Sequence, residues 1–252
     1  ERLPPFLFYL MTDDVYLQPR SLKLSHKIYK YMDFDSLLQI LNGKFYMACK
    51  ETFNDHFDAV KYFPVNARWE YTPFGEKTSK EKYEQNEKRI NKIEETAKWL
   101  TSCWTENRNN ILMWQTYTKG YCGVCIESTI CDFIKSIKHN NYNILCGKVD
   151  YGCYSPSMRT KEYAFNKLPQ YKDEKEIRFY FLNNKDQYTN EQKKIHRLSY
   201  NVFDIEPEKM IDSIILSPFI RSPNSADMLK DLLENRFNFL KGKIKTNIIK
   251  YI

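Results

Sequence analysis

Residues 174–182 read Glu-Lys-Glu-Ile-Arg-Phe-Tyr-Phe-Leu, and this stretch predicts a strand over 176–182. Side chains alternate between the two faces of a strand, so Glu174, Glu176 and Arg178 are expected on one face. Ile177 and the aromatic residue two positions later make the other face apolar. The pattern therefore indicates a strand that covers a core on one side only.

The three charged residues allow two interpretations. Three charged groups in a row are costly to bury unless they are paired or used. Arg178 beside Glu176 is expected to keep this carboxylate ionised, and a fixed anion suits the stabilisation of a positive, oxocarbenium-like centre. The alternative is a solvated ladder of ion pairs without any chemistry.

On both sides of this strand, the sequence alternates irregularly between short expected strands and short expected helices. Further strands are expected over 28–31, 44–49, 99–104, 121–127, 144–151, 210–216 and 244–251. Helices are expected from Asp33 or Asp35 to Leu41 with Gly43 as the stop, from Asn110 over Met113, Trp114 and Tyr117, and over 129–138 and 224–237. Because neighbouring strands look like hairpins, the pattern predicts an α+β fold. Its sheet would be mixed or split, largely antiparallel and flanked by short helices, not doubly wound and parallel.

The length of 252 residues fits a single domain over 1–252. Residues 76–98 stand out because they contain seven Lys or Arg and six Glu. Apolar residues form only a narrow stripe there, so we expect a charged helical insert on the surface.

Composition restricts the class of protein. Lys and Arg number 39 against 32 Asp and Glu, a net charge of +7, which permits an anionic partner without identifying one. Seven cysteines in no regular spacing argue against a secreted disulfide framework and favour the reducing cytoplasm. No apolar run approaches the roughly 20 residues of a membrane-spanning helix, so no membrane partner is expected.

Two more groups are candidate binding residues. Asn54 and Asp55 follow an expected strand, where such residues either form a turn or face a ligand. Trp114 and Tyr117 lie about one helical turn apart, either as core packing or as an aromatic wall for a planar ring.

A metal site is not expected. Cys122-Gly-Val-Cys125 is a lone pair, whereas structural zinc needs four ligands, and a strand would place the two thiols on opposite faces. The four histidines do not cluster.

Taken together, these segments resemble a bacterial family, domain of unknown function 2971. The matching blocks are Tyr29-Lys-Tyr31 with the helix after it, Phe53-Asn-Asp-His-Phe-Asp58, Ser102-Cys-Trp-Thr-Glu106 followed by Asn110-Ile-Leu-Met-Trp-Gln-Thr-Tyr117 and Gly123-Val-Cys-Ile126, and Lys167 to Arg178. The chain departs from the family where His56, Asp58 and Tyr171 replace its usual Pro, Glu and Trp.

The order of these motifs is also similar, more distantly, to the ADP-ribosyltransferase fold. This resemblance implies that NAD is a substrate, with Glu176 stabilising the oxocarbenium ion and Glu174 orienting or deprotonating the acceptor. The residues that it implies for NAD contacts are Tyr29, Tyr31, Asn54, Asp55, Trp114, Tyr117 and Arg178. It further implies a bacterial toxin or antiphage-defence effector, with a nucleic-acid or protein acceptor and a cognate antitoxin or regulatory partner.

Two other functions stay open at this point. One is a metal-dependent nuclease that uses Asp55, Glu174 and Glu176 around a divalent ion. The other is a non-catalytic module whose aromatic groove binds a nucleotide or a nucleic acid.

Overall fold

A computed structural model describes residues 9–12, 15–19, 21–49, 99–118, 123–138, 142–152, 164–183, 200–220 and 222–246. The predicted loop at 53–58, with Asn54 and Asp55, and the predicted insert at 76–98 lie outside these ranges. In the part of the chain that is described, every helix is too short or too polar to cross a bilayer.

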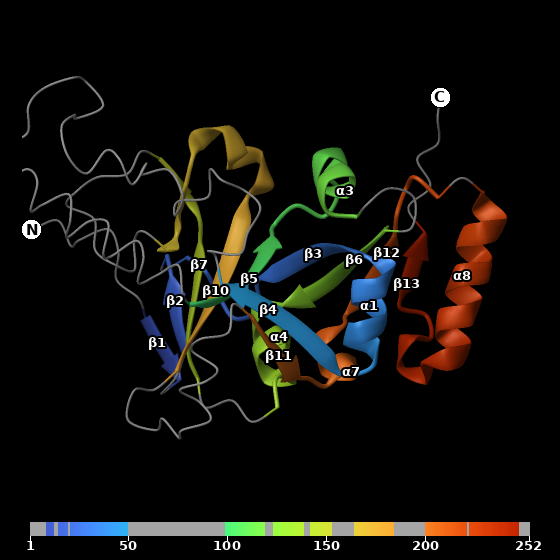
Figure 1. Cartoon of the computed structure of the whole chain (residues 1–252), viewed down its shortest axis with the longest axis horizontal. Helices are drawn as coiled ribbons and strands as arrows, with labels where there is room; N and C mark the ends of the chain where they lie inside the picture. Colours follow the sequence, from blue (N-terminus) through green and yellow to red (C-terminus); the bar gives the residue numbers. More distant parts are fainter. Residues whose placement is uncertain are drawn as a thin grey trace, which may run out of the picture.

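Eleven described strands form one twisted sheet, and the helices lie around it (Figure 1). The strands of this sheet are β1 (Tyr9–Thr12), β2 (Val15–Gln18), β3 (Lys27–Asp33), β4 (Lys44–Cys49), β5 (Leu100–Thr105), β6 (Gly123–Thr129), β7 (Tyr142–Lys148), β10 (Glu176–Asn183), β11 (Tyr200–Asp204), β12 (Ser213–Leu216) and β13 (Ile244–Thr246). A separate pair contains β8 (Asp150–Tyr151) and β9 (Asn166–Lys167). The helices are α1 (Phe34–Leu41), α3 (Ile111–Tyr117), α4 (Ile130–Ser136), α7 (Pro207–Met210) and α8 (Pro223–Arg236), with 3-10 turns η3 (Pro169–Glu174) and η5 (Asn238–Leu240).

The sheet branches at β5, which decides where a cleft can form. On one side β5 pairs with β10 over six residue pairs. On its other side β3 pairs with it only at Tyr29↔Thr105, while β4 pairs with it at the opposite end through Ala48 and Cys49. Among the described pairs, only β2–β7, β12–β13 and β8–β9 are parallel. Of the predicted mixed or split, largely antiparallel sheet with short helices, the mixed and largely antiparallel form is therefore confirmed.

Helix α1 lies between the two diverging strands in sequence, and its ends follow the predicted signals. The Asp33 carboxylate accepts a hydrogen bond from the Ser36 backbone N–H, which is the N-cap interaction, so Asp33 and not Asp35 begins the helix. Gly43 adopts a φ of 78°, a left-handed conformation that ends the helix without the strain of a side chain.

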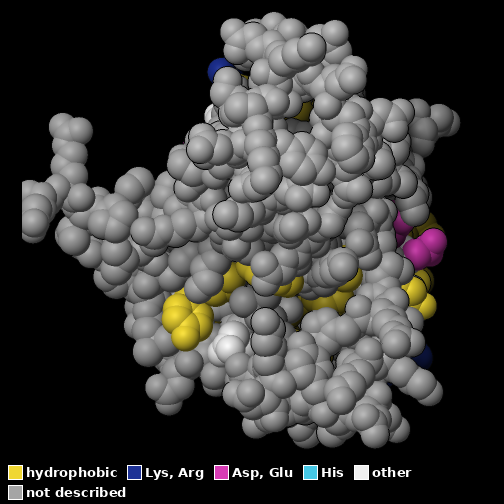
Figure 2. All heavy atoms as spheres, turned by 60° about the vertical axis from the view of Figure 1, so that its left-hand side comes forward, with side chains coloured by type: hydrophobic (Ala, Val, Ile, Leu, Met, Phe, Trp, Pro, Cys, Tyr) yellow, Lys and Arg dark blue, Asp and Glu magenta, His cyan; other side chains and the backbone are white. Residues whose placement is uncertain are grey.

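Most of the core lies on one face of the sheet, under α1, α4 and α8. Aliphatic side chains make up most of it, and they surround a group of aromatic rings in which Trp104, Phe133 and Phe179 contact one another at centroid distances of 4.8–6.4 Å. Helix α3 covers the other face over β3. On the side that lies to the left in Figure 1, described hydrophobic side chains reach the surface in a narrow band (Figure 2).

One predicted strand is shorter than expected. Residues 210–216 were expected to be extended throughout, but Met210 ends helix α7 and β12 begins at Ser213. Pro207 at the first helical turn explains the helix, because proline is pre-organised for that position.

Candidate active site

The two predicted glutamates meet, although not as neighbours on one strand. Glu174 ends the 3-10 turn η3, and Lys175 adopts a left-handed φ of 43° before β10 begins at Glu176. The expectation that Glu174 shares the strand face with Arg178 is therefore wrong. The ammonium group of Lys167 brings the carboxylates together instead, with Nζ 2.7 Å from Oε2 of Glu174 and 3.3 Å from Oε2 of Glu176.

Glu176 is a buried carboxylate held between cations. Its side chain is 5% exposed. Nη2 of Arg178 donates to its Oε2 at 3.0 Å, and Nε of the same guanidinium donates to its Oε1. Such a two-point contact fixes the orientation of the carboxylate and favours the ionised form.

Arg178 is a positioning residue in this arrangement. Its side chain is 0% exposed, and Nη1 donates to the backbone carbonyl of Ala164 at 2.9 Å. The guanidinium of Arg178 is enclosed by the protein, so the structure does not place it where it could contact NAD directly, although such a contact was predicted. A buried carboxylate needs a charged partner, and the guanidinium of Arg178 serves as that partner for Glu176.

Glu174 is the more exposed carboxylate of the pair. Its side chain is 12% exposed, and its Oε1 accepts a hydrogen bond of 3.3 Å from the Tyr117 hydroxyl. Burial raises the pKa of Glu174, Glu176 adds to this rise, and Lys167 and Tyr117 oppose it. A raised pKa moves a carboxylate toward the range in which it accepts and returns protons.

A cross-strand row links this cluster to β3. Thr105 on β5 pairs with Glu176 on one side and with Tyr29 on the other, so the three side chains share a face of the sheet. The Thr105 hydroxyl donates to the backbone carbonyl of Glu174 at 2.5 Å. Thr105 therefore holds the turn before β10 in place.

The aromatic residues divide into two groups. Trp114 is 1% exposed and packs edge-to-face on Tyr31, with centroids 4.8 Å apart, and Tyr29 belongs to the same buried cluster under α3. The indole ring of Trp114 is part of this small core. It is therefore not placed to stack on a planar ligand, although such stacking was predicted. Tyr31 instead orders the loop before α3, donating to the Asn107 carbonyl at 2.9 Å and accepting from the Asn110 N–H at 3.2 Å.

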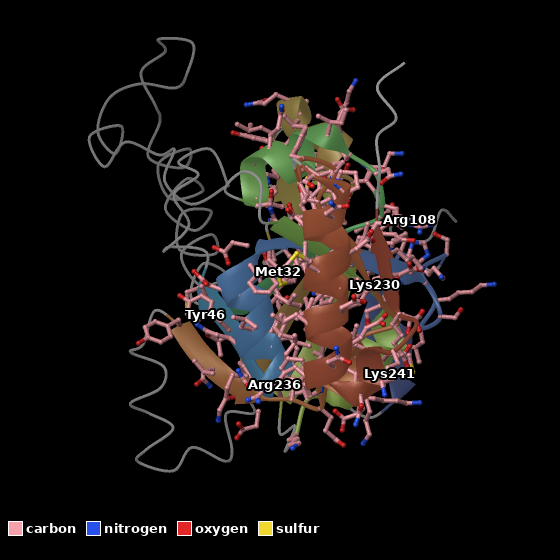
Figure 3. All side chains as sticks on the ribbon, turned by 90° about the vertical axis from the view of Figure 1, so that its right-hand side faces the viewer. Met32, Tyr46, Arg108, Lys230, Arg236 and Lys241 are labelled. Carbon is pink, nitrogen blue, oxygen red and sulfur yellow. The ribbon has the colours of Figure 1, made fainter. Side chains whose placement is uncertain are left out.

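A cleft of about 380 Å³ opens where β3 and β4 diverge. Of the predicted site residues, Tyr31 and Tyr117 line it, and Lys30 and Phe45 form part of its wall. Tyr117 connects the cleft with the carboxylates, since its hydroxyl contacts Glu174. Figure 3 shows Met32 and Tyr46, which also line the cleft, on the α1 side of α8, with Arg108 on the other side.

Sequence reasoning missed Lys167, Thr105 and Lys30. Lys167 began a motif that the family resemblance included, but nothing in its local pattern marked it as the link between two glutamates. In the described ranges no three His, Cys, Asp or Glu side chains are placed to hold a metal ion. Asp55, which the nuclease interpretation requires, lies outside the described residues, so that interpretation stays a prediction.

The fold and the site together define a class: an α+β protein with a branched, largely antiparallel sheet and a buried carboxylate pair beside a cleft. No known family model matches the chain, and no curated protein does. The resemblance to domain of unknown function 2971 is therefore unsupported and stays a prediction.

Among solved structures, one that aligns with the chain over most of its length is Thermus sp. 2.9 DarT in complex with ADP-ribosylated ssDNA. The two chains share 13% identity, the alignment covers 92% of this chain and 97% of that chain, and the TM-score is 0.38. At this TM-score the similarity supports no conclusion about function.

Proposed function

We propose that this protein is an ADP-ribosyltransferase-like enzyme that cleaves NAD, either transferring ADP-ribose to an acceptor or hydrolysing NAD as a glycohydrolase. One observation carries the proposal: Glu174 and Glu176 share the Lys167 ammonium group, and Tyr117 joins them to a cleft. A cleft of about 380 Å³ lies in the range of small-molecule sites, roughly 300–1,000 Å³.

The proposed reaction needs only the groups of this cluster and the substrates. The bond between the nicotinamide nitrogen and ribose C1′ breaks, and its electron pair leaves with nicotinamide, which becomes neutral. The clamped carboxylate of Glu176 stabilises the cationic sugar carbon. An oxygen or nitrogen of the acceptor, or of water, then bonds to C1′, and its proton passes to Glu174.

The two carboxylates lie in different environments, and each environment suits a different role. Glu176 is fixed by the Arg178 guanidinium and does not reorganise during the reaction, a condition for electrostatic stabilisation. Glu174 is the more exposed of the two and has a raised pKa, so it is the better proton acceptor. Lys167 reduces the repulsion between the two carboxylates.

The acceptor is proposed to be a nucleic acid, with an acidic protein as the alternative. The net charge of +7 supports an anionic acceptor. The biological role proposed for such a reaction is that of a bacterial toxin or antiphage effector in the cytoplasm, restrained by a cognate antitoxin.

One observation favours a second candidate, a non-catalytic nucleotide-binding module. Both oxygens of Glu176 already have cationic partners, as in a structural ion-pair network. Release of nicotinamide from NAD separates the two candidates.

The experiment is to incubate the protein with NAD and quantify nicotinamide by chromatography. We expect release by the wild type and a loss of about 10²-fold or more in Glu176→Gln, the size of effect seen when one stabilising group is removed. Glu127→Gln is the matched control, because Glu127 is also a buried, ion-paired glutamate but belongs to β6. Absence of release by the folded wild type would favour the binding module.

A further inference from the structure

Lys30 occupies an unusual place for a lysine. Alternation along β3 puts it on the same side as Ile28 and Met32, which belong to the main core. Its Nζ lies 5.7 Å from the ring centroids of both Phe45 and Trp104 and donates to the backbone carbonyl of Cys103 at 2.8 Å. The branching of the sheet leaves this position open to the cleft, which Lys30 lines.

The charge of Lys30 has no carboxylate partner within 4 Å among the described residues. The other two charged residues that line the cleft are already engaged: Lys44 contacts Asp204 at 2.6 Å, and the Asp33 carboxylate caps α1. Burial lowers the pKa of the Lys30 amine, whereas Cys103 and Glu176 act in the opposite direction. Holding an ammonium group here is costly, and an anion in the cleft would offset the cost.

We propose that the cleft between β3, α1 and β4 binds a phosphate or pyrophosphate group of a small nucleotide-sized ligand, with Lys30 as its cation. Ser36 and Gln39, both exposed and lining the cleft, supply neutral hydrogen-bond donors to the same group. The proposal deepens the proposed function, because NAD carries a pyrophosphate. It does not depend on catalysis, since phosphate binding can be measured without turnover.

The test is isothermal titration calorimetry with pyrophosphate and ADP on the wild type, Lys30→Met and Lys209→Met. Lys209 is an exposed lysine outside the cleft, bonded to Glu206 at 2.8 Å, so its variant loses the same charge elsewhere. We expect both ligands to bind the wild type and Lys209→Met alike, and Lys30→Met to bind them at least about tenfold more weakly. Adenosine, which lacks phosphate, is expected to show no dependence on Lys30.

Folding of the variant is checked by thermal unfolding without ligand. Methionine fits an apolar site beside Phe45 and Trp104, so Lys30→Met is expected to be as stable as the wild type or more stable. Lys30→Arg, which keeps the charge, is expected to bind pyrophosphate better than Lys30→Met.

Several outcomes would overturn the inference. The first is equal binding of pyrophosphate and ADP by the wild type and Lys30→Met. The second is no binding of either ligand by the wild type. The third is an affinity for a single-stranded oligonucleotide that depends on Lys30, while the affinity for pyrophosphate does not. Pyrophosphate binding that depends on Lys30, together with no cleavage of NAD, would uphold the site and refute the proposed function. Cleavage of NAD at the same rate by the wild type and Lys30→Met would uphold the proposed function and refute the phosphate site.

Discussion

The Tyr117 hydroxyl lies 3.3 Å from Oε1 of Glu174 and thereby joins helix α3 to the turn before β10. The two residues are 57 positions apart in the chain. Burial raises the pKa of the Tyr117 phenol, so this hydroxyl keeps its proton and donates to the carboxylate at neutral pH.

Removal of this hydroxyl tests whether Tyr117 acts through Glu174. Tyr117→Phe should lower the rate of nicotinamide release several-fold. It should change the free energy of unfolding by no more than about 1 kcal/mol, because only one exposed hydrogen bond is lost. Tyr200→Phe is the control, since Tyr200 is an exposed ring on β11. Equal rates in Tyr117→Phe and the wild type would show that this contact has no role in the reaction.

Lys167 should matter for stability as well as for activity. Lys167→Met leaves two carboxylates close together without their shared cation, and loss of one partner of a buried ion pair costs about 3–5 kcal/mol. Urea unfolding measures this loss. Lys44→Met, at an exposed pair with Asp204, should cost less than about 1 kcal/mol. Similar stability of the two variants would mean that the carboxylates tolerate each other.

The ion pairs of Glu127 predict a pH dependence of stability. Burial alone would raise the pKa of Glu127. Hydrogen bonds from Lys27, Ser213 and Lys245 outweigh burial and lower the pKa of this carboxyl from 4.5 to about 2. Because the folded pKa lies below the ordinary value, the stabilisation is present above about pH 4.5 and is lost as the pH falls toward 2.

Glu127→Gln should therefore be less stable than the wild type at pH 7, and the difference should shrink at pH 3. Urea unfolding at both pH values measures it. A difference that stays constant or grows at pH 3 would contradict the assigned ion pairs.

Gly123 controls the position of α3. A Cβ atom at this position would lie 2.1 Å from the Thr118 Cβ, and Thr118 is the C-cap of α3. Gly123→Ala should cost about 1–3 kcal/mol and shift Tyr117, so nicotinamide release should fall too. Gly152→Ala is the control, because the nearest atom to its Cβ among the described residues would be Nδ2 of Asn166, at 3.9 Å. Full activity in Gly123→Ala would show that the cluster does not depend on the position of α3.

Local patterns predicted much of the fold. The alternation after Glu176 placed β10, and the Asp33 cap and Gly43 stop placed α1, because these signals act within a few residues of the chain. The approach of Glu174 to Glu176 was predicted for the wrong reason. Alternation suggested a shared strand face, whereas a left-handed Lys175 ends the 3-10 turn between them.

The rest of the site depends on contacts between segments far apart in sequence. Trp114 and Tyr117 have the same helical spacing whether they pack in a core or face a ligand, and only the tertiary structure separates the buried indole from the exposed phenol. The open position of Lys30 likewise results from the divergence of β3 and β4 from β5, which no short-range pattern encodes.

The most direct test of NAD cleavage at the carboxylate pair is the single-turnover rate of nicotinamide release with NAD in excess of its dissociation constant. The wild type should release nicotinamide, and Glu176→Gln should do so at least about 10²-fold more slowly with unchanged NAD affinity. Equal rates in the two folded proteins, or no release by the wild type, would contradict the assignment of Glu176 as the group that stabilises the sugar cation.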